Sequence, residues 1–231
     1  MVERMESRAR AIMELLGTLI LVFTIQASGS PMAIGAVLIA IVFAGGPISG
    51  AHYNPAVSAA IALRGNGHMK SSMGTYWLCQ IIGGVLGAML GGFVTSSYST
   101  VAVGVGHTVA QALVGELIIT FLLCFVVLCV ATNSKAENNH YYGLAIGLVV
   151  AAGAVSVGPV SGGAFNPAVA FGLCAAKSFE NVGYALSVVV VNLLGGIAAY
   201  GAFVLVAPHE FCDIEFDGAA TTGEATPLTS P

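Results

Sequence analysis

Residues 49–57 read SGAHYNPAV and residues 161–169 read SGGAFNPAV, so one nine-residue phrase occurs once in each half of the chain. Each copy follows an apolar segment and has the features of a helix start: glycine for backbone freedom, asparagine as a cap and proline at the first helical position. A helix that starts between apolar segments needs polar surroundings. The repeat therefore predicts two half-helices that point at one channel. Their tips would be formed by Asn54, Pro55, Ala56, Asn166, Pro167 and Ala168.

The composition predicts that lipid surrounds most of this protein. The chain is 57% hydrophobic and 8% charged, with 30 glycines in 231 residues and a mean hydropathy of +0.91. A soluble domain needs a more highly charged surface. No basic stripe indicates nucleic-acid binding. The five cysteines lack the spacing of a metal site, and four of them lie in apolar segments, so we expect packed thiols and no metal or other cofactor.

The apolar runs predict an all-α membrane protein with six spanning helices, because each run has about the 20 residues that a bilayer requires. The expected spans are 9–27, 33–51, 72–94, 109–131, 141–159 and 182–206. Two further apolar stretches, 54–63 and 166–175, begin at the repeated motif and are too short to cross. We expect them to enter the membrane as re-entrant half-helices from opposite sides.

The basic residues predict which side of the membrane each loop occupies. With the N-terminus in the cytoplasm, six of the seven lysines and arginines fall inside and only Lys177 falls outside. Residues 1–8 would then be a cytoplasmic N-terminus. Residues 207–231 contain five of the 11 acidic residues and are expected to form a disordered cytoplasmic tail.

An internal repeat relates the two halves of the expected channel domain, residues 9–206. The copies cover about 9–94 and 109–206, and a shift of 112 residues superposes the two motifs. Glu14 matches Glu116 at a shift of 102, because the connection after the first span is shorter. Three spans per half is an odd number, so the second copy must be inserted upside down, as in many transporters and channels.

The double Asn-Pro-Ala motif, the inverted repeat of three spans and the glutamate in the first span of each half together resemble the aquaporin, or major intrinsic protein, family. The resemblance covers about residues 9–206. It implies a right-handed bundle of six tilted helices with two half-helices that meet at mid-membrane. It also implies a homotetramer with one pore per subunit, and a passive channel rather than an enzyme, with water and small uncharged solutes as the permeants.

Elementary electrostatics explains how such tips would exclude ions. Asn54 and Asn166 would offer side-chain amides to a passing oxygen atom. Both helix N-termini would direct the positive ends of their dipoles at the same place. A cation or a proton meets a repulsive field there, whereas a neutral dipole such as water only reorients.

Glu14 and Glu116 are the only carboxylates within the expected spans, and an unpaired carboxylate is costly in hydrocarbon. One interpretation is a proton relay, as in pumps. The other, which the resemblance favours, is that each acid accepts hydrogen bonds from the irregular backbone before a half-helix. The only lysine or arginine within the spans is Arg10, at the very start of the first span, and the lack of one deeper in the membrane argues against a coupled transporter.

The expected selectivity filter departs from the family pattern. Most members have an arginine just after the second Asn-Pro-Ala, where this chain has Val169. Counted from the two asparagines, the other filter positions are Ile34, Ala154 and Gly163. Such a ring would be wide and apolar, so we expect ammonia, hydrogen peroxide, urea, glycerol or boric acid to pass in addition to water. A bulky neighbour such as Phe165 is the alternative, because it can refill the space.

Three further side chains, His52, Tyr76 and Trp77, each have a functional and a structural interpretation. His52 is a candidate pH gate, because imidazole gains its charge near neutrality, and the alternative is a hydrogen bond to a neighbouring loop. Tyr76 and Trp77 are expected to anchor the chain at a membrane interface rather than to contact a ligand.

An ion-coupled secondary transporter of a small solute is the alternative function, because such transporters also use inverted repeats and broken helices. It would need ion-coordinating residues at the midplane, and the sequence offers only the two separated glutamates there. A membrane enzyme is a third class. The sequence places no paired acids, Ser/His set or metal cluster at a common membrane depth, which argues against it.

Overall fold

The structure, a computed structural model, describes residues 2–65 and 67–211, and every regular element within those residues is a helix. Five of the helices in this described part are long and apolar enough to span a bilayer. They are α1 (Val2–Ser28), α2 (Pro31–Ser49), α4 (Gly67–Thr95), α5 (Val109–Ala131) and α9 (Val182–Val206). The shorter elements are α3 (Pro55–Leu63), η1 (Ser134–Ala136), α6 (Tyr142–Ser156), α7 (Gly158–Ser161), α8 (Pro167–Ala176) and η2 (Pro208–Glu210). The all-α membrane fold expected from the sequence is confirmed.

The expected span 141–159 is the one that differs in form. α6 has 15 residues and ends at Ser156, and the chain resumes as α7 after a turn at Val157. Pro159 favours this break, because proline has no N–H to donate and its ring clashes with the carbonyl group four residues earlier. Pro47, its counterpart in the repeat, is accommodated inside α2. Proline therefore permits the interruption without imposing it.

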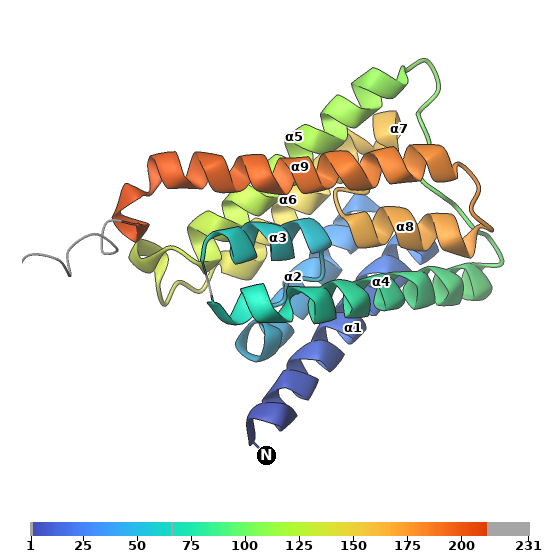
Figure 1. The fold of residues 1–231 in the computed structure, drawn as a ribbon. Helices are drawn as coiled ribbons and strands as arrows, with labels where there is room; N and C mark the ends of the chain where they lie inside the picture. The colour runs from blue at the N-terminus through green and yellow to red at the C-terminus, as the bar shows by residue number, and fades with distance from the viewer. Residues whose placement is uncertain (1, 66, 212–231) are drawn as a thin grey trace, which may run out of the picture.

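The two half-helices α3 and α8 lie end to end, with α4 on one side of them and α9 on the other (Figure 1). Around this row, α1 packs against α4, α5 packs against α9, and α2 packs against α6. Glycines allow the closest of these contacts. A Cβ atom on Gly83 of α4 would lie 2.4 Å from the carbonyl oxygen of Leu15 in α1, and one on Gly87 would lie 2.3 Å from that of Leu19. Small residues at such crossings are typical of helices in lipid.

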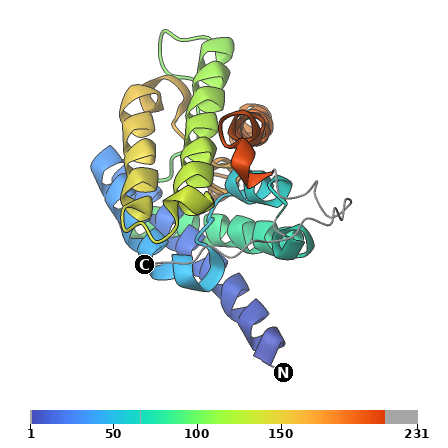
Figure 2. The ribbon, with the colours of Figure 1, turned by 90° about the vertical axis from the view of Figure 1, so that its left-hand side faces the viewer.

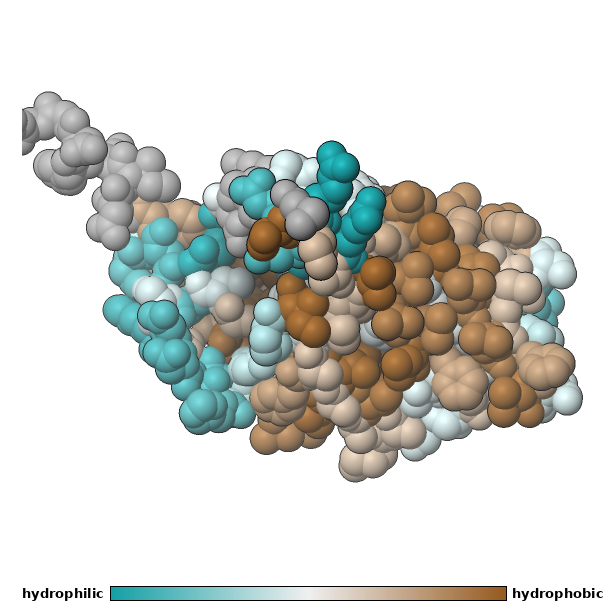
Figure 3. All heavy atoms as spheres, turned by 90° about the horizontal axis from the view of Figure 1, so that it is seen from below, coloured by the Kyte–Doolittle hydropathy of each residue, from teal (hydrophilic) through white to brown (hydrophobic). Residues whose placement is uncertain are grey.

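The outer surface of the bundle is largely apolar. Figure 3 shows a broad hydrophobic area, with one group of hydrophilic residues at the end of the bundle where η1 and η2 lie in Figure 1 and a second group at the middle of the upper edge. Exposed leucines, isoleucines, valines and phenylalanines occur on all five long helices. Lipid rather than water is the solvent that this surface fits.

The ends of the chain differ from the expected boundaries. α1 already begins at Val2, so most of the expected N-terminal segment 1–8 is part of the first helix. The expected disorder from residue 207 is wrong for residues 207–211, which form η2 and end in Phe211. The Phe211 ring packs edge-on against the rings of Tyr200 and Phe203, at centroid distances of 6.3 and 6.1 Å. The rest of the expected tail, 212–231, lies outside the described residues.

Candidate pore

The tips of α3 and α8 have the same capping geometry. Asn54 is the cap of α3, and its Oδ1 accepts a hydrogen bond from the Ala56 N–H at 2.9 Å. Asn166 is the cap of α8, and its Oδ1 accepts from the Ala168 N–H at 2.9 Å. A proline, Pro55 or Pro167, occupies the first position of each helix, where its missing N–H has no consequence.

The second amide atom of each asparagine crosses to the other half of the chain. Asn54 Nδ2 donates to the carbonyl oxygen of Phe165 at 2.9 Å, and Asn166 Nδ2 donates to that of Tyr53 at 2.8 Å. Tyr53 and Phe165 have φ angles of 49° and 50°, in the left-handed region that bulky residues rarely adopt. This uncommon backbone aims each carbonyl group at the opposite asparagine. The two tips are thus joined by a reciprocal pair of hydrogen bonds.

Glu14 of α1 is fully buried and accepts four hydrogen bonds next to the first tip. Its Oε1 accepts from Ser49 Oγ at 2.6 Å and from the His52 N–H at 3.0 Å. Its Oε2 accepts from the Tyr53 N–H and from Gln80 Nε2, both at 2.8 Å. The carboxylate therefore holds the loop that leads into α3 by two of its backbone N–H groups.

Glu116 of α5 is also fully buried and has the corresponding position next to the second tip. Its Oε1 accepts from Ser161 Oγ at 2.6 Å and from the Ala164 N–H at 2.9 Å. Its Oε2 accepts from the Phe165 N–H at 2.8 Å. A buried carboxylate with several donors is the arrangement that the structural interpretation of both acids requires.

Gln80 and Asn192 complete the two carboxylate sites in different ways. Gln80 Nε2 donates to Ser58 Oγ at 2.9 Å in addition to its carboxylate, and Gln80 Oε1 is buried without a hydrogen-bond partner in the described part of the chain. Asn192 satisfies its neighbours in one orientation of its side-chain amide. In that orientation, its amide oxygen accepts a hydrogen bond from the Asn166 N–H at 2.8 Å, and its amide nitrogen donates to Glu116 Oε2 at 3.2 Å. The shorter side chain of Asn192 thus reaches the pore-tip backbone directly.

A narrow cavity runs past the joined tips. It offers about 30 Å³ of space to the centres of water-sized molecules, which is room for about two waters. Both cap asparagines line it, and so do all four residues expected to form the filter. The filter positions are Ile34, Ala154, Gly163 and Val169. Within residues 2–65 and 67–211, no group of three His, Cys, Asp or Glu side chains offers a metal site.

Phe165, the bulky neighbour weighed against a wide filter, lies beside the small residues at the filter positions. The Phe165 ring is buried beside them, with Cζ 3.6 Å from where a Cβ on Gly163 would lie. Its Cε2 lies 3.0 Å from the corresponding position on Gly153, next to Ala154. The ring thus occupies the room that the glycines leave, and Val169 is only 1% exposed.

A wider cavity of about 730 Å³ adjoins the narrow one. The two share several wall residues, including Val42, Ala51 and His52, so His52 lies where the narrow cavity opens into this vestibule. His52 Nδ1 lies 3.0 Å from Ser58 Oγ, and the imidazole packs edge-on against the Tyr76 ring at 5.2 Å. The imidazole is therefore held in place from two sides.

Tyr76 and Trp77 both donate hydrogen bonds to the first motif. Tyr76 is 2% exposed, and its hydroxyl group donates to the Ser49 carbonyl oxygen at 2.8 Å. Trp77 Nε1 donates to the Pro55 carbonyl oxygen at 3.1 Å. The anchoring role expected for Tyr76 is wrong. The Tyr184 hydroxyl group makes a similar bond in the second half, to the Ser161 carbonyl oxygen at 2.9 Å. The shift of 112 residues pairs Tyr76 with Val188, so the sequence repeat gave no signal of it.

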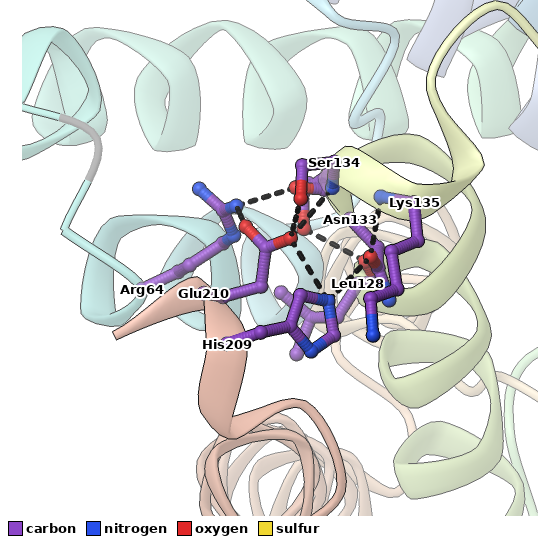
Figure 4. Close-up of polar contacts among 8 residues, drawn as sticks. Arg64, Leu128, Asn133, Ser134, Lys135, His209 and Glu210 are labelled. Atoms are coloured by element: carbon purple, nitrogen blue, oxygen red, sulfur yellow. Dashed lines mark hydrogen bonds and ion pairs between the residues drawn. The ribbon is translucent and has the colours of Figure 1, made fainter. Parts of the chain in front are cut away.

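The C-terminal end of α3 is fixed by a polar cluster that no sequence pattern indicated, here called the Arg64 latch (Arg64, Thr132, Ser134 and Glu210). Arg64 donates to the Thr132 carbonyl oxygen at 2.5 Å and forms an ion pair with Glu210 (Figure 4). The N–H and hydroxyl groups of Ser134 donate to Glu210 Oε1 at 2.6 and 2.5 Å. The Ser134 hydroxyl group, followed by the Ser134 N–H and the Arg64 charge, holds the pKa of Glu210 below its usual value. The latch joins α3 to η1 and to η2.

The comparisons with known proteins match the chain to one family. The family model of the major intrinsic proteins matches residues 1–204, and it matches again over residues 142–223. A probable aquaporin TIP-type from Antirrhinum majus is 38% identical over 128 residues, which are 54% of this chain and 51% of that protein. Probable aquaporin TIP2-1 from Oryza sativa subsp. japonica is 33% identical over 173 residues, 71% of this chain and 69% of that protein.

Among solved structures, the X-ray structure of the aquaglyceroporin from Plasmodium falciparum has the same fold, with a TM-score of 0.73. The match covers 88% of this chain and 98% of that chain, at 19% sequence identity. The aligned part of this chain spans about half the length of the first relatives that it matches, 51% for Antirrhinum majus and likewise 51% for aquaporin TIP2-3 from Arabidopsis thaliana.

Proposed function

The chain belongs to the major intrinsic protein family, and from this premise we propose that it is a passive channel for water and small uncharged solutes. One observation carries the proposal. The reciprocal hydrogen bonds of Asn54 and Asn166 hold two helix starts at one place beside a narrow cavity. An enzyme or an ion-coupled transporter has no evident use for such a pair.

Ion exclusion in this proposal comes from the joined tips. Each cap asparagine uses one of its two amide hydrogens for the opposite carbonyl group, so the other remains for the oxygen of a passing solute. The N-termini of α3 and α8 add the positive ends of their helix dipoles at the same position. A cation loses hydration there without gaining a negative partner, whereas water exchanges one hydrogen bond for another.

Val169 makes this central barrier more important. No guanidinium group stands at the filter position after the second motif, so the proposed filter adds no fixed positive charge. Proton exclusion then depends mainly on the two dipoles and the two amides. The filter itself acts through size and through its apolar side chains, which disfavour a filled water column.

The narrow cavity points to a size order among the solutes. We expect water, ammonia and hydrogen peroxide to pass more readily than urea, boric acid or glycerol, because Phe165 fills the space beside Gly163. The cavity has room for about two water molecules, and a glycerol molecule would have to displace the ring or its neighbours.

His52 is proposed as a secondary control point at the vestibule. Protonation of its imidazole would place a positive charge where the narrow cavity begins, and it would alter the bond to Ser58. Flux that falls on acidification in the wild type but not in a His52→Gln variant would support gating. Equal pH profiles would leave His52 as a support of the loop.

The proposed assembly follows the family. We infer a homotetramer with one pore per subunit, and an orientation with both termini in the cytoplasm. The vestibule and the Arg64 latch then face the cytoplasm, and the filter residues face the outside. Protease accessibility of the C-terminus in sealed vesicles of known orientation tests the orientation. Mass measurement in detergent tests the tetramer.

The deciding experiment is an osmotic assay in proteoliposomes without any ion gradient. Rapid shrinkage that exceeds the rate of empty vesicles of the same lipid supports a channel. Flux that appears only with a sodium or proton gradient would overturn the proposal in favour of the coupled transporter. A panel of ammonia, hydrogen peroxide, urea, boric acid and glycerol in the same vesicles then ranks the solutes.

A further inference from the structure

The first turns of α1 leave the bundle sideways. In Figure 1 the long helices α4 and α9 run across the view, whereas the N-terminal part of α1 points away from them and projects beyond the other helices. Figure 2, turned by 90°, shows the same segment standing out from the side of the bundle. All of residues 2–9 are exposed. This segment continues the axis of α1, which crosses the direction of α4 and α9 obliquely, and so it projects beyond the side of the bundle.

One face of this projecting segment is an apolar stripe. Its members recur at intervals of three and four residues, so they lie in one line along the helix. The stripe consists of Val2, Met5, Ala9, Ile12 and Leu16, and all five are exposed. It continues at Ile20 in the spanning part of α1, where the exposed face is apolar as well. The side of α1 that packs into the bundle, marked by Glu14 and Leu21, is roughly opposite.

Two arginines flank the stripe on one side. Arg4 and Arg8 are one helical turn apart, and neither has a carboxylate partner in the described part of the chain. On the other flank, Arg10 is paired with Glu6 at 3.6 Å. Like charges at this spacing weaken a helix slightly, so an anion between Arg4 and Arg8 would stabilise the segment. The planar guanidinium group matches the oxygens of a phosphate.

We propose that residues 2–12 form an interfacial helix that rests on the bilayer, with the apolar stripe against the acyl chains and with Arg4 and Arg8 bound to lipid phosphates. Continuity identifies lipid as the occupant, because the stripe extends the exposed apolar line of the spanning part of the same helix. The charge pattern agrees, because basic residues beside an apolar face are typical of helices at anionic interfaces. The inference needs only a membrane-embedded chain, so it does not depend on the proposed channel activity.

Two tryptophan variants test the proposal in proteoliposomes. Met5→Trp places the fluorophore on the stripe, and Ser7→Trp places it on the opposite side of the same turn as the matched control. The wild-type protein supplies the baseline for Trp77, the one tryptophan of the chain. We expect Met5→Trp to add a blue-shifted emission that lipids brominated on their acyl chains quench. Ser7→Trp should add an emission that is neither shifted nor quenched.

The other outcomes overturn the proposal. A blue-shifted but unquenched emission from Met5→Trp would mean that a second copy of the chain covers the stripe. An emission like that of Ser7→Trp would mean that the stripe remains in water. Water permeability of both variants should equal that of the wild type, which separates this result from any failure of the channel proposal.

The role of the arginines has its own test. In vesicles where either the anionic phosphatidylglycerol or the zwitterionic phosphatidylcholine carries the bromine, Met5→Trp should be quenched several-fold more by the anionic lipid. Adding Arg4→Gln and Arg8→Gln should abolish that preference while leaving the blue shift in place. An unchanged preference would overturn the assignment of phosphate to these two side chains.

Discussion

The half-helices α3 and α8 are alike where they meet and different where they end. At their tips, each cap asparagine donates to the opposite half at nearly the same distance, 2.9 Å for Asn54 and 2.8 Å for Asn166. At their other ends, Arg64 bonds to Thr132 and Glu210 in distant parts of the chain. Lys177, at the end of α8, forms an ion pair at 3.6 Å with Glu180, three residues further on.

This contrast indicates that the two half-helix tips have one joint function, whereas their far ends do not. A barrier built from two opposed dipoles needs both tips in matching geometry, so neither tip can change alone. The far ends face different compartments in the proposed orientation and have no such requirement. One of them is joined to the C-terminal segment through the Arg64 latch, whereas the other has a local ion pair.

The equivalence of the two tips is tested most severely by removing their carboxylates. Glu14→Ala and Glu116→Ala each leave at least three buried donors without an acceptor, so each should destabilise the fold by about 4 kcal/mol or more. Thermal unfolding and yield in detergent measure the loss. Glu14→Gln and Glu116→Gln retain an acceptor oxygen and should lose less. Normal stability of either alanine variant would show that its tip does not depend on the acid.

A charge at each tip tests the barrier. Asn54→Asp and Asn166→Asp keep the capping oxygen but place a carboxylate among the dipoles, so proton leak should rise by about tenfold or more in both. The leak is measured with a pH-sensitive dye in proteoliposomes under a potassium diffusion potential. Equal leaks support matching tips. A leak from one variant alone would place the barrier on one half-helix.

The third comparison uses equivalent positions one turn after each tip. Val169→Arg should reduce urea and glycerol flux more than water flux, because the proposed filter is on the α8 side of the cavity. Val57 occupies the same position on α3 and also lines the cavity, so Val57→Arg is the matched control. Similar discrimination by both variants in the solute panel would show that the constriction lies elsewhere.

The ends of the half-helices should differ in stability by a smaller amount. Arg64→Gln breaks a partly buried ion pair and should destabilise the protein by about 1–2 kcal/mol. Lys177→Gln removes an exposed pair and should change the stability by less than about 0.5 kcal/mol. Thermal unfolding of Glu210→Gln and of the double variant Arg64→Gln/Glu210→Gln completes a double-mutant cycle, which gives the coupling free energy between the two side chains. A coupling near zero would mean that the latch contributes nothing.

The smallest expected effect is the pH dependence of the Arg64 latch. The folded-state pKa of Glu210 is lowered, chiefly by the Ser134 hydroxyl group, so its contribution to stability is present above the unfolded-state pKa of the carboxyl group. The contribution is lost as the pH falls through the lowered folded-state value. The difference in melting temperature between the wild type and Glu210→Gln should therefore shrink on acidification. A difference that stays constant with pH would contradict an ionised latch.

The site features that can be predicted from the sequence are those that occur in both halves of the repeat. Asn54 and Asn166 follow one pattern, and so do Glu14 and Glu116, so a match between halves identified them without coordinates. Hydrophobic run lengths located the apolar parts of the helices, since a bilayer sets the length of a spanning segment. They missed the polar first turns of α1 and α4, which begin seven and five residues before the expected spans. The family and the all-α membrane fold are confirmed on these grounds.

Features that occur in only one half of the repeat could not be predicted from the sequence. Arg64 and Glu210 are 146 residues apart, and neither periodicity nor the repeat indicates that they meet. The break at Val157 depends on packing, because Pro47 shows that the same proline can stay inside a helix. The sequence offers Phe165 as a bulky neighbour of the filter, but it does not reveal the left-handed backbone, with φ of 50°, from which the ring lies beside Gly163.

The crossed amides have a consequence for how this molecule can be made. The acceptor of the Asn54 amide is the carbonyl oxygen of Phe165, 111 positions later in the chain. The carbonyl oxygen of Tyr53 likewise accepts from Asn166 in the second half. A nascent chain of which only the first half has been synthesised therefore has an incomplete centre. The Asn54 amide has no acceptor yet, and the Tyr53 carbonyl oxygen has no donor. Biogenesis must keep that centre hydrated or shielded until translation supplies the second motif. Two separately expressed halves would, by the same logic, complete each other.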